Sequence, residues 1–157
     1  MKRMTILFLS LLLLAGCAPT DTEEPAAMDG PTNSERLPLG AGFRYSTYGP
    51  QTDPGPAYWA SVGERMAARF PGATPQGIWI VGNFTGNGTY LSFPAETDDP
   101  FVTRTYVDMN EEALSLFDAR GVKIWLQVEP GNADMVALID LVLGQYGRHD
   151  CVIGFGV

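Results

Sequence analysis

The sequence predicts an α/β fold with a mainly parallel sheet, and three observations lead to that class. After residue 40, short apolar runs alternate with longer amphipathic stretches, as in successive strand–helix units. The composition, with 45% apolar and 18% charged residues, excludes a fibrous or fully disordered chain. Ten Lys and Arg residues against 18 Asp and Glu residues give a net charge of −8, so we expect no nucleic-acid partner.

Four strands are predicted from the short apolar runs, at residues 42–48, 77–82, 122–129 and 151–157. The first helix is predicted at residues 56–70, because Pro56 suits a first turn and Pro71-Gly72 ends the pattern. Its inward face is expected to contain Trp59, Val62, Met66 and Phe70.

The second and third helices are predicted from their end signals. The second covers residues 110–120, with Asp108 or Asn110 as the cap and Gly121 in the left-handed position after the last turn. The third covers residues 134–146, and its expected inward residues are Met135, Leu138, Ile139 and Val142.

Alternation along the strands indicates how the sheet is covered, because successive side chains point to opposite faces. In the third strand one face is apolar and the other mixed; the mixed face contains Lys123, Trp125, Gln127 and Glu129. A (β/α)8 barrel has helices only outside and tolerates polar groups inside, whereas a doubly wound sheet is covered on both faces. We therefore predict the N-terminal half of a (β/α)8 barrel, with a doubly wound sheet as the alternative.

The same argument assigns the inward residues of the other strands. In the first strand, Phe43 and Tyr45 are expected to face the helices, and the inward residues are Arg44, Ser46 and Tyr48. In the second, Ile78 and Ile80 are expected to face the helices, and the inward residues are Trp79, Val81 and Asn83. A complete barrel needs about 250 residues. Because the sequence stops at Val157 within an apolar strand, we expect a truncated chain whose open sheet edges favour self-association.

The first 17 residues have the features of an export signal. Lys2 and Arg3 precede an apolar run at residues 6–14 that is too short to span a bilayer stably. The run ends in Leu14-Ala15-Gly16-Cys17, which resembles the lipobox of bacterial lipoproteins. That resemblance implies acylation of Cys17; the alternative is a cleaved secretory peptide with a chance cysteine.

Residues 18–40 are rich in Pro, Thr, Asp, Glu, Ser and Gly, so we expect a disordered tether before a folded domain at residues 41–157. Several acyl chains on Cys17 would provide stable membrane attachment. Because Ala18 stands where lipoproteins retained in the inner membrane have Asp, the resemblance implies the cell envelope, and the outer membrane if the cell has two.

The candidate site lies at the carboxyl ends of the strands, where this fold places its chemistry. Glu129 ends the third strand, Gln127 lies one pleat deeper, and Arg44 is positioned to pair with a carboxylate. Residues suited to binding hydroxyl groups or stacking on sugar rings are Asn83, Tyr48 and Trp125. The alternative is that Glu129 and Arg44 form a buried structural ion pair.

Other motifs indicate no cofactor or metal. The glycine-rich residues 82–88 lack the Lys-Ser/Thr of a P-loop and the spacing of a dinucleotide fingerprint, and we expect a loop there. His149 stands alone in the sequence without a second ligand at metal spacing, and Cys151 is expected to be a buried, apolar residue without a disulfide partner.

Residues 125–131 and 151–157 resemble the third and fourth strands of bacterial lipoproteins of the glycoside hydrolase superfamily, akin to family 18 chitinases. The resemblance implies a general acid in an Asp-x-Glu motif, which would begin just after Val157. Gly154 and Gly156 would leave room for a sugar ring. We therefore expect a lipid-anchored protein that is inactive alone, with longer relatives that bind or hydrolyse glycans. The alternative is a noncatalytic glycan-binding or structural lipoprotein.

Overall fold

The computed structural model describes residues 39–46 and 49–157, so the predicted signal peptide, Cys17, nearly all of the predicted tether and Tyr48 lie outside the described residues. In chain order the elements of the described part are β1 (Gly40–Tyr45), α1 (Pro56–Ala67), β2 (Thr74–Phe84), β3 (Thr89–Leu91), β4 (Val102–Arg104), α2 (Glu111–Arg120), β5 (Lys123–Val128), α3 (Met135–Tyr146) and β6 (Val152–Gly156). The predicted α/β class is confirmed.

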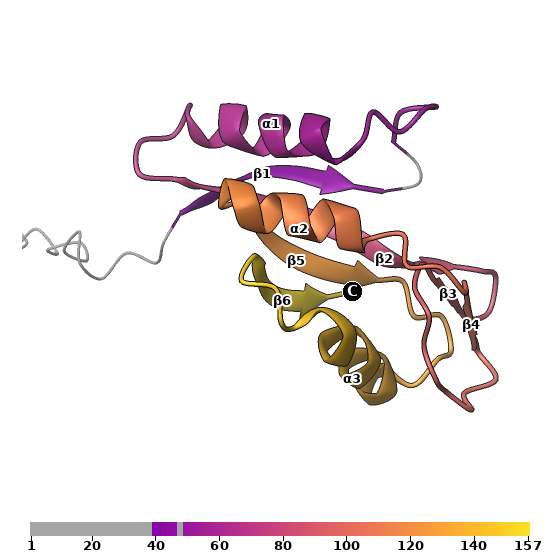
Figure 1. Ribbon diagram of the computed structural model, residues 1–157. Helices are drawn as coiled ribbons and strands as arrows, with labels where there is room; N and C mark the ends of the chain where they lie inside the picture. Colours follow the sequence, from indigo (N-terminus) through magenta and orange to yellow (C-terminus); the bar gives the residue numbers. More distant parts are fainter. Residues whose placement is uncertain (1–38, 47–48) are drawn as a thin grey trace, which may run out of the picture. The chain divides into compact units, whose positions relative to one another are not determined.

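The strands form one sheet, in which β1, β2, β5 and β6 are parallel neighbours in that order (Figure 1). The last residues of β2 extend beyond β1 and pair with β3 in the antiparallel direction, and β4 lies parallel to β3. Strands that are successive in the parallel part of the sheet are thus also neighbours in space. Among the described residues, no helix is long and apolar enough to cross a bilayer.

The three helices of the described part pack on the same face of this sheet. Asn110, at the start of α2, accepts a hydrogen bond from Trp79 Nε1 of β2 at 3.0 Å and donates one to the Tyr146 hydroxyl of α3 at 3.0 Å. Arg120 Nε of α2 donates to Glu64 Oε1 of α1 at 2.8 Å. These contacts join the helices over one side of the sheet, unlike a doubly wound sheet, which has helices on both sides.

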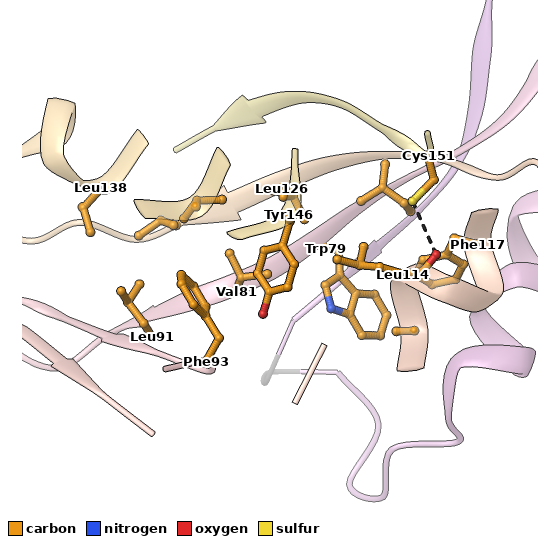
Figure 2. Close-up of a cluster of buried hydrophobic side chains, with 14 of the residues drawn as sticks. Trp79, Val81, Leu91, Phe93, Leu114, Phe117, Leu126, Leu138, Tyr146 and Cys151 are labelled. Carbon is orange, nitrogen blue, oxygen red and sulfur yellow. Dashed lines mark hydrogen bonds between the residues drawn. The ribbon is translucent and has the colours of Figure 1, made fainter. Parts of the chain in front are cut away.

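We call this side the helix-covered face and the opposite side, which carries Arg44, Ile78, Trp125 and Gln127, the open face. Figure 2 shows side chains from β2, β5, α2 and α3 meeting in the core of the helix-covered face. On β5 the predicted alternation is confirmed, since Leu126 is fully buried whereas Trp125 is 43% exposed. Four residues are fully buried in β5 and at the position just before it: Val122, Ile124, Leu126 and Val128.

The predicted orientation of β2 is wrong. Trp79 and Val81 belong to the core of the helix-covered face, whereas Ile78 is 37% exposed and Ile80 is buried outside that core. Every residue from 78 to 81 is apolar, so alternation alone does not distinguish the two faces. The orientation follows from distant partners: the Trp79 ring stacks on Tyr45 with centroids 4.0 Å apart.

Helix α1 begins at the predicted Pro56 but ends at Ala67, three residues early, and its buried face differs from the prediction. Met66 and Phe70 are 38% and 46% exposed. The buried residues of α1 are Trp59, Ala60, Gly63 and Ala67. Small side chains allow a close approach, because even a Cβ atom on Gly63 would lie 3.4 Å from the Phe43 ring.

The predicted ends of α2 and α3 are largely confirmed. Asp108 Oδ1 accepts the N–H groups of Asn110 at 2.8 Å and Glu111 at 3.1 Å, and Gly121 has a φ of 65°. Asp134 caps α3 by accepting the N–H of Ala137 at 2.8 Å. The buried residues of α3 are Leu138, Val142 and Tyr146, whereas the expected Met135 and Ile139 are half-buried.

The loop predicted after β2 is instead a hairpin, since β2 continues to Phe84 and Thr85 N donates to Gly88 O at 3.0 Å before β3. The last strand also departs from simple alternation. Its register shifts beside Ile124, and Val152 and Phe155 pack against the core whereas Ile153 is 42% exposed.

Candidate functional site

The structure brings together three of the predicted site residues on the open face. Arg44 Nε donates a hydrogen bond to Gln127 Oε1 at 3.0 Å, and Arg44 Nη2 lies 3.9 Å from Glu129 Oε1. The second carboxylate oxygen of Glu129 accepts the backbone N–H of Phe84 at 3.0 Å. We call Arg44, Gln127 and Glu129 the open-face cluster.

Strand alternation and register explain this meeting. Arg44 lies opposite Ile78 of β2, and Ile78 lies opposite Trp125 of β5, so the three residues form one row across the sheet. Gln127 is two residues beyond Trp125 on the same face, and Glu129 follows the end of β5. The cluster therefore lies at the carboxyl ends of parallel strands, where α/β proteins commonly bind ligands.

The open-face cluster is accessible to solvent. The side chains of Arg44 and Glu129 are 45% and 26% exposed, so the buried ion pair considered as the alternative is wrong for this geometry. A pair at 3.9 Å with this exposure contributes less than about 1 kcal/mol to stability. What the arrangement provides is one fixed carboxylate and one guanidinium, both facing solvent.

Trp125 lies beside this cluster but occupies space that was expected to be empty. A Cβ atom on Gly154 would lie 2.4 Å from the Trp125 ring, so the ring covers this glycine. The prediction that Gly154 leaves room for a sugar ring beneath the site is therefore wrong. Instead, a hollow of about 180 Å³ on the open face is bounded by Arg44, Ile78, Trp125, Leu126, Gln127, Gly156 and Val157.

Asn83 lies in a different place. It lines a cavity of about 610 Å³ at the carboxyl ends of β1 and β2, together with Tyr45, Trp79 and Asn110. We call this cavity the Tyr45 pocket. Sequence reasoning missed it, because its remaining walls come mainly from the segment before α1, the β2–β3 hairpin and the start of α2, and no local pattern connects these segments.

The Tyr45 pocket has a fixed aromatic wall and an acidic side. Tyr45 stacks on Trp79 and meets Trp59 edge to face, with centroids 5.7 Å apart. Asp53 Oδ1 accepts the indole N–H of Trp59 at 3.2 Å and the N–H of Gly55 at 2.9 Å. Burial, and then the neighbouring Asp53 carboxylate, raise the pKa of the Tyr45 phenol.

A third cluster corrects the expectation that His149 stands alone. His149 Nδ1 lies 2.6 Å from Asp118 Oδ2, and Cys151 N donates to Asp118 Oδ1 at 2.6 Å. Hydrogen bonds from His149 and Cys151 lower the pKa of Asp118 against the opposing effect of burial.

The donor atoms of Asp118, His149 and Cys151 lie within 4.8 Å of one another, which is a metal-like grouping. Burial and the Asp118 carboxylate raise the pKa of the Cys151 thiol to about 12. Its Sγ donates to Leu114 O at 3.5 Å (Figure 2). Since both carboxylate oxygens of Asp118 already have partners, this cluster is a hydrogen-bond network between α2 and the start of β6.

Fold and sites together define an α/β protein with helices on one face of its sheet and a mixture of polar and apolar side chains on the other. Comparisons with protein-family models, curated proteins and solved structures find no match for this chain. The functional argument therefore rests on the geometry of the open-face cluster and the Tyr45 pocket.

Proposed function

We propose that this chain is a lipid-anchored protein of the bacterial cell envelope whose folded part is the first half of a (β/α)8 barrel and binds glycans on its open face. The observation that carries the proposal is the open-face cluster at the carboxyl ends of β1 and β5. A carboxylate and an amide can bond sugar hydroxyl groups, and the exposed Trp125 ring offers a surface for a sugar ring.

Two further features support the barrel. The parallel strands follow one another in chain order, and the helices between them pack on one side, as in consecutive βα units of a barrel. Among the described residues, β1 and β6 each lack a parallel partner on one side. We expect these edges to promote self-association of residues 41–157, which sedimentation velocity would reveal.

We expect glycan binding rather than glycan hydrolysis. Most glycoside hydrolases place two carboxyl groups on either side of the scissile bond, one as acid and one as base or nucleophile. The open-face cluster contains a single carboxylate, that of Glu129. Its role in the proposal is to accept a hydrogen bond from a sugar hydroxyl while Arg44 and Phe84 N hold it in place.

Glu129→Gln tests the glycan proposal in the full chain. The variant keeps shape while removing the charged acceptor, so affinity for chito-oligosaccharides or peptidoglycan fragments should fall about tenfold, or about 1.4 kcal/mol. Titration calorimetry measures the affinity, and thermal unfolding should change little because the ion pair is exposed.

The matched control is Glu96→Gln, which removes an exposed carboxylate from a surface segment after β3 and should leave binding unchanged. Unchanged glycan affinity in Glu129→Gln, with a large loss of stability, would contradict the proposal. That result would favour the noncatalytic structural lipoprotein.

The anchoring part of the proposal predicts that Cys17→Ser abolishes acylation. The variant lacks the sulfur to which lipid attaches, so incorporation of labelled fatty acid should be lost and the protein should leave the membrane fraction. Cys151→Ala is the control and should keep the label, because Cys151 is buried in the folded part. A Cys17→Ser protein that still fractionates with membranes contradicts the assignment.

A further inference from the structure

We propose that the Tyr45 pocket is a second binding site, which takes a small organic cation bearing an ammonium group. This inference goes beyond the glycan proposal and uses none of the residues of the open-face cluster. It rests on the size of the cavity, on the sign of its charges and on the aromatic rings in its wall.

The size of the pocket suits a small molecule. Its volume of about 610 Å³ falls within the range of about 300–1,000 Å³ typical of ligand sites. It lies where β1 ends and where β2 passes from pairing with β1 to pairing with β3, at the carboxyl ends of parallel strands. The start of α2, at Met109 and Asn110, forms another part of the wall.

The charges of the pocket have a single sign. Asp53 and Glu112 line it, and no Lys, Arg or His residue does so among the described residues. Anionic ligands would therefore be repelled. Asp53 is held in place by the Trp59 and Gly55 N–H groups, so its position is set before a ligand arrives.

The aromatic residues of the wall also favour a positively charged ligand. Tyr45 and Tyr90 are partly exposed in the pocket wall, Trp79 is buried against Tyr45, and cations bind favourably over the accessible faces of aromatic rings. Trp79 is fixed by its hydrogen bond to Asn110 and by its stacking on Tyr45.

Aromatic rings beside carboxylates, one of them held in place, select ammonium groups over uncharged groups of the same shape. Choline is therefore a suitable probe. Its uncharged analogue, in which a carbon atom replaces the nitrogen, has the same shape without the charge. Trp79 lies in the pocket wall, so tryptophan fluorescence reports occupancy directly.

The experiment titrates the full chain with choline and with the uncharged analogue. Choline should quench or shift the fluorescence saturably and bind about tenfold more tightly than the analogue. Asp53→Asn should weaken choline binding about tenfold, and Glu112→Gln about threefold, while Glu96→Gln, which does not line this pocket, should change nothing. Thermal unfolding of each variant identifies any loss of folding.

Asp53 also accepts a hydrogen bond from Trp59, so the Asp53→Asn substitution affects folding contacts as well as the pocket. If Asp53→Asn is unfolded, Glu112→Gln is the deciding variant. Equal affinity for choline and its analogue would overturn the proposal. So would unchanged choline affinity in a folded Glu112→Gln protein, or the absence of a saturable signal. A loss of glycan binding in Glu129→Gln with choline binding intact would separate the two sites.

Discussion

The two faces of β5 differ sharply in burial, although successive residues of the strand alternate between them. Leu126 is fully buried beneath the helices, whereas its neighbour Trp125 is 43% exposed on the open face. Helix-side residues of this strand fill the core, and open-face residues make hydrogen bonds and ion pairs in contact with solvent. The contrast teaches that one face of the sheet supplies the buried core while the other presents its side chains to solvent.

The largest expected effect comes from a direct comparison of the two neighbours. Leu126→Ala removes a fully buried side chain, so it should lower the free energy of unfolding by about 2–5 kcal/mol. Trp125→Ala should cost much less, because nearly half of that side chain is already exposed. Urea denaturation of both variants measures the two free energies of unfolding. Equal losses of stability would contradict the view that only the helix-covered face of β5 contributes to the core.

An intermediate effect is expected at Asn110, where the helix-covered face contains polar contacts. Asn110→Ala leaves the Trp79 indole N–H without its acceptor and removes one partner of the Tyr146 hydroxyl. The expected cost is about 1–3 kcal/mol, the penalty of an unsatisfied buried group. Asn132→Ala, at an exposed position, is the control and should change stability little. A neutral Asn110→Ala result would contradict the bridging role.

The smallest effect concerns pH. The pKa of Asp118 is lower in the folded state than its unfolded value of about 4. The ionised carboxylate therefore stabilises the fold above that unfolded value, and this stabilisation is lost as the pH falls through the folded-state pKa. Asp118→Asn should therefore be less stable than the parent chain at neutral pH and approach it in acid. Melting temperatures measured across this range test the sign, and a constant difference at all pH values would refute it.

The orientation of β5 could be predicted from the sequence, but that of β2 could not. Polar and apolar residues alternate in β5, so its two faces were predictable from strand period, whereas the meeting of Arg44 with Gln127 and Glu129 also depends on the register of β1, β2 and β5. Every residue from 78 to 81 in β2 is apolar, and its orientation depends on Asn110, which lies 31 residues beyond Trp79. Local pattern contains no information about that partner.

The Tyr45 pocket shows the same limit at a functional site. Tyr45 ends β1 and Asn83 lies one residue before the end of β2, and Asn83 was expected at a site, but the cavity also needs Asp53 and Glu112 from separate segments. Only the packing of α1 and α2 brings these segments together. Likewise, the proximity of His149 to Asp118 depends on the approach of β6 to α2.

The chain-order succession of β1, β2, β5 and β6 also has a consequence for how the protein is made. After β1, each parallel strand pairs with one that precedes it in the chain, so a polypeptide emerging amino end first can dock each new strand on the sheet already formed. Each step adds one strand–helix unit to that sheet, so assembly can follow the direction of synthesis.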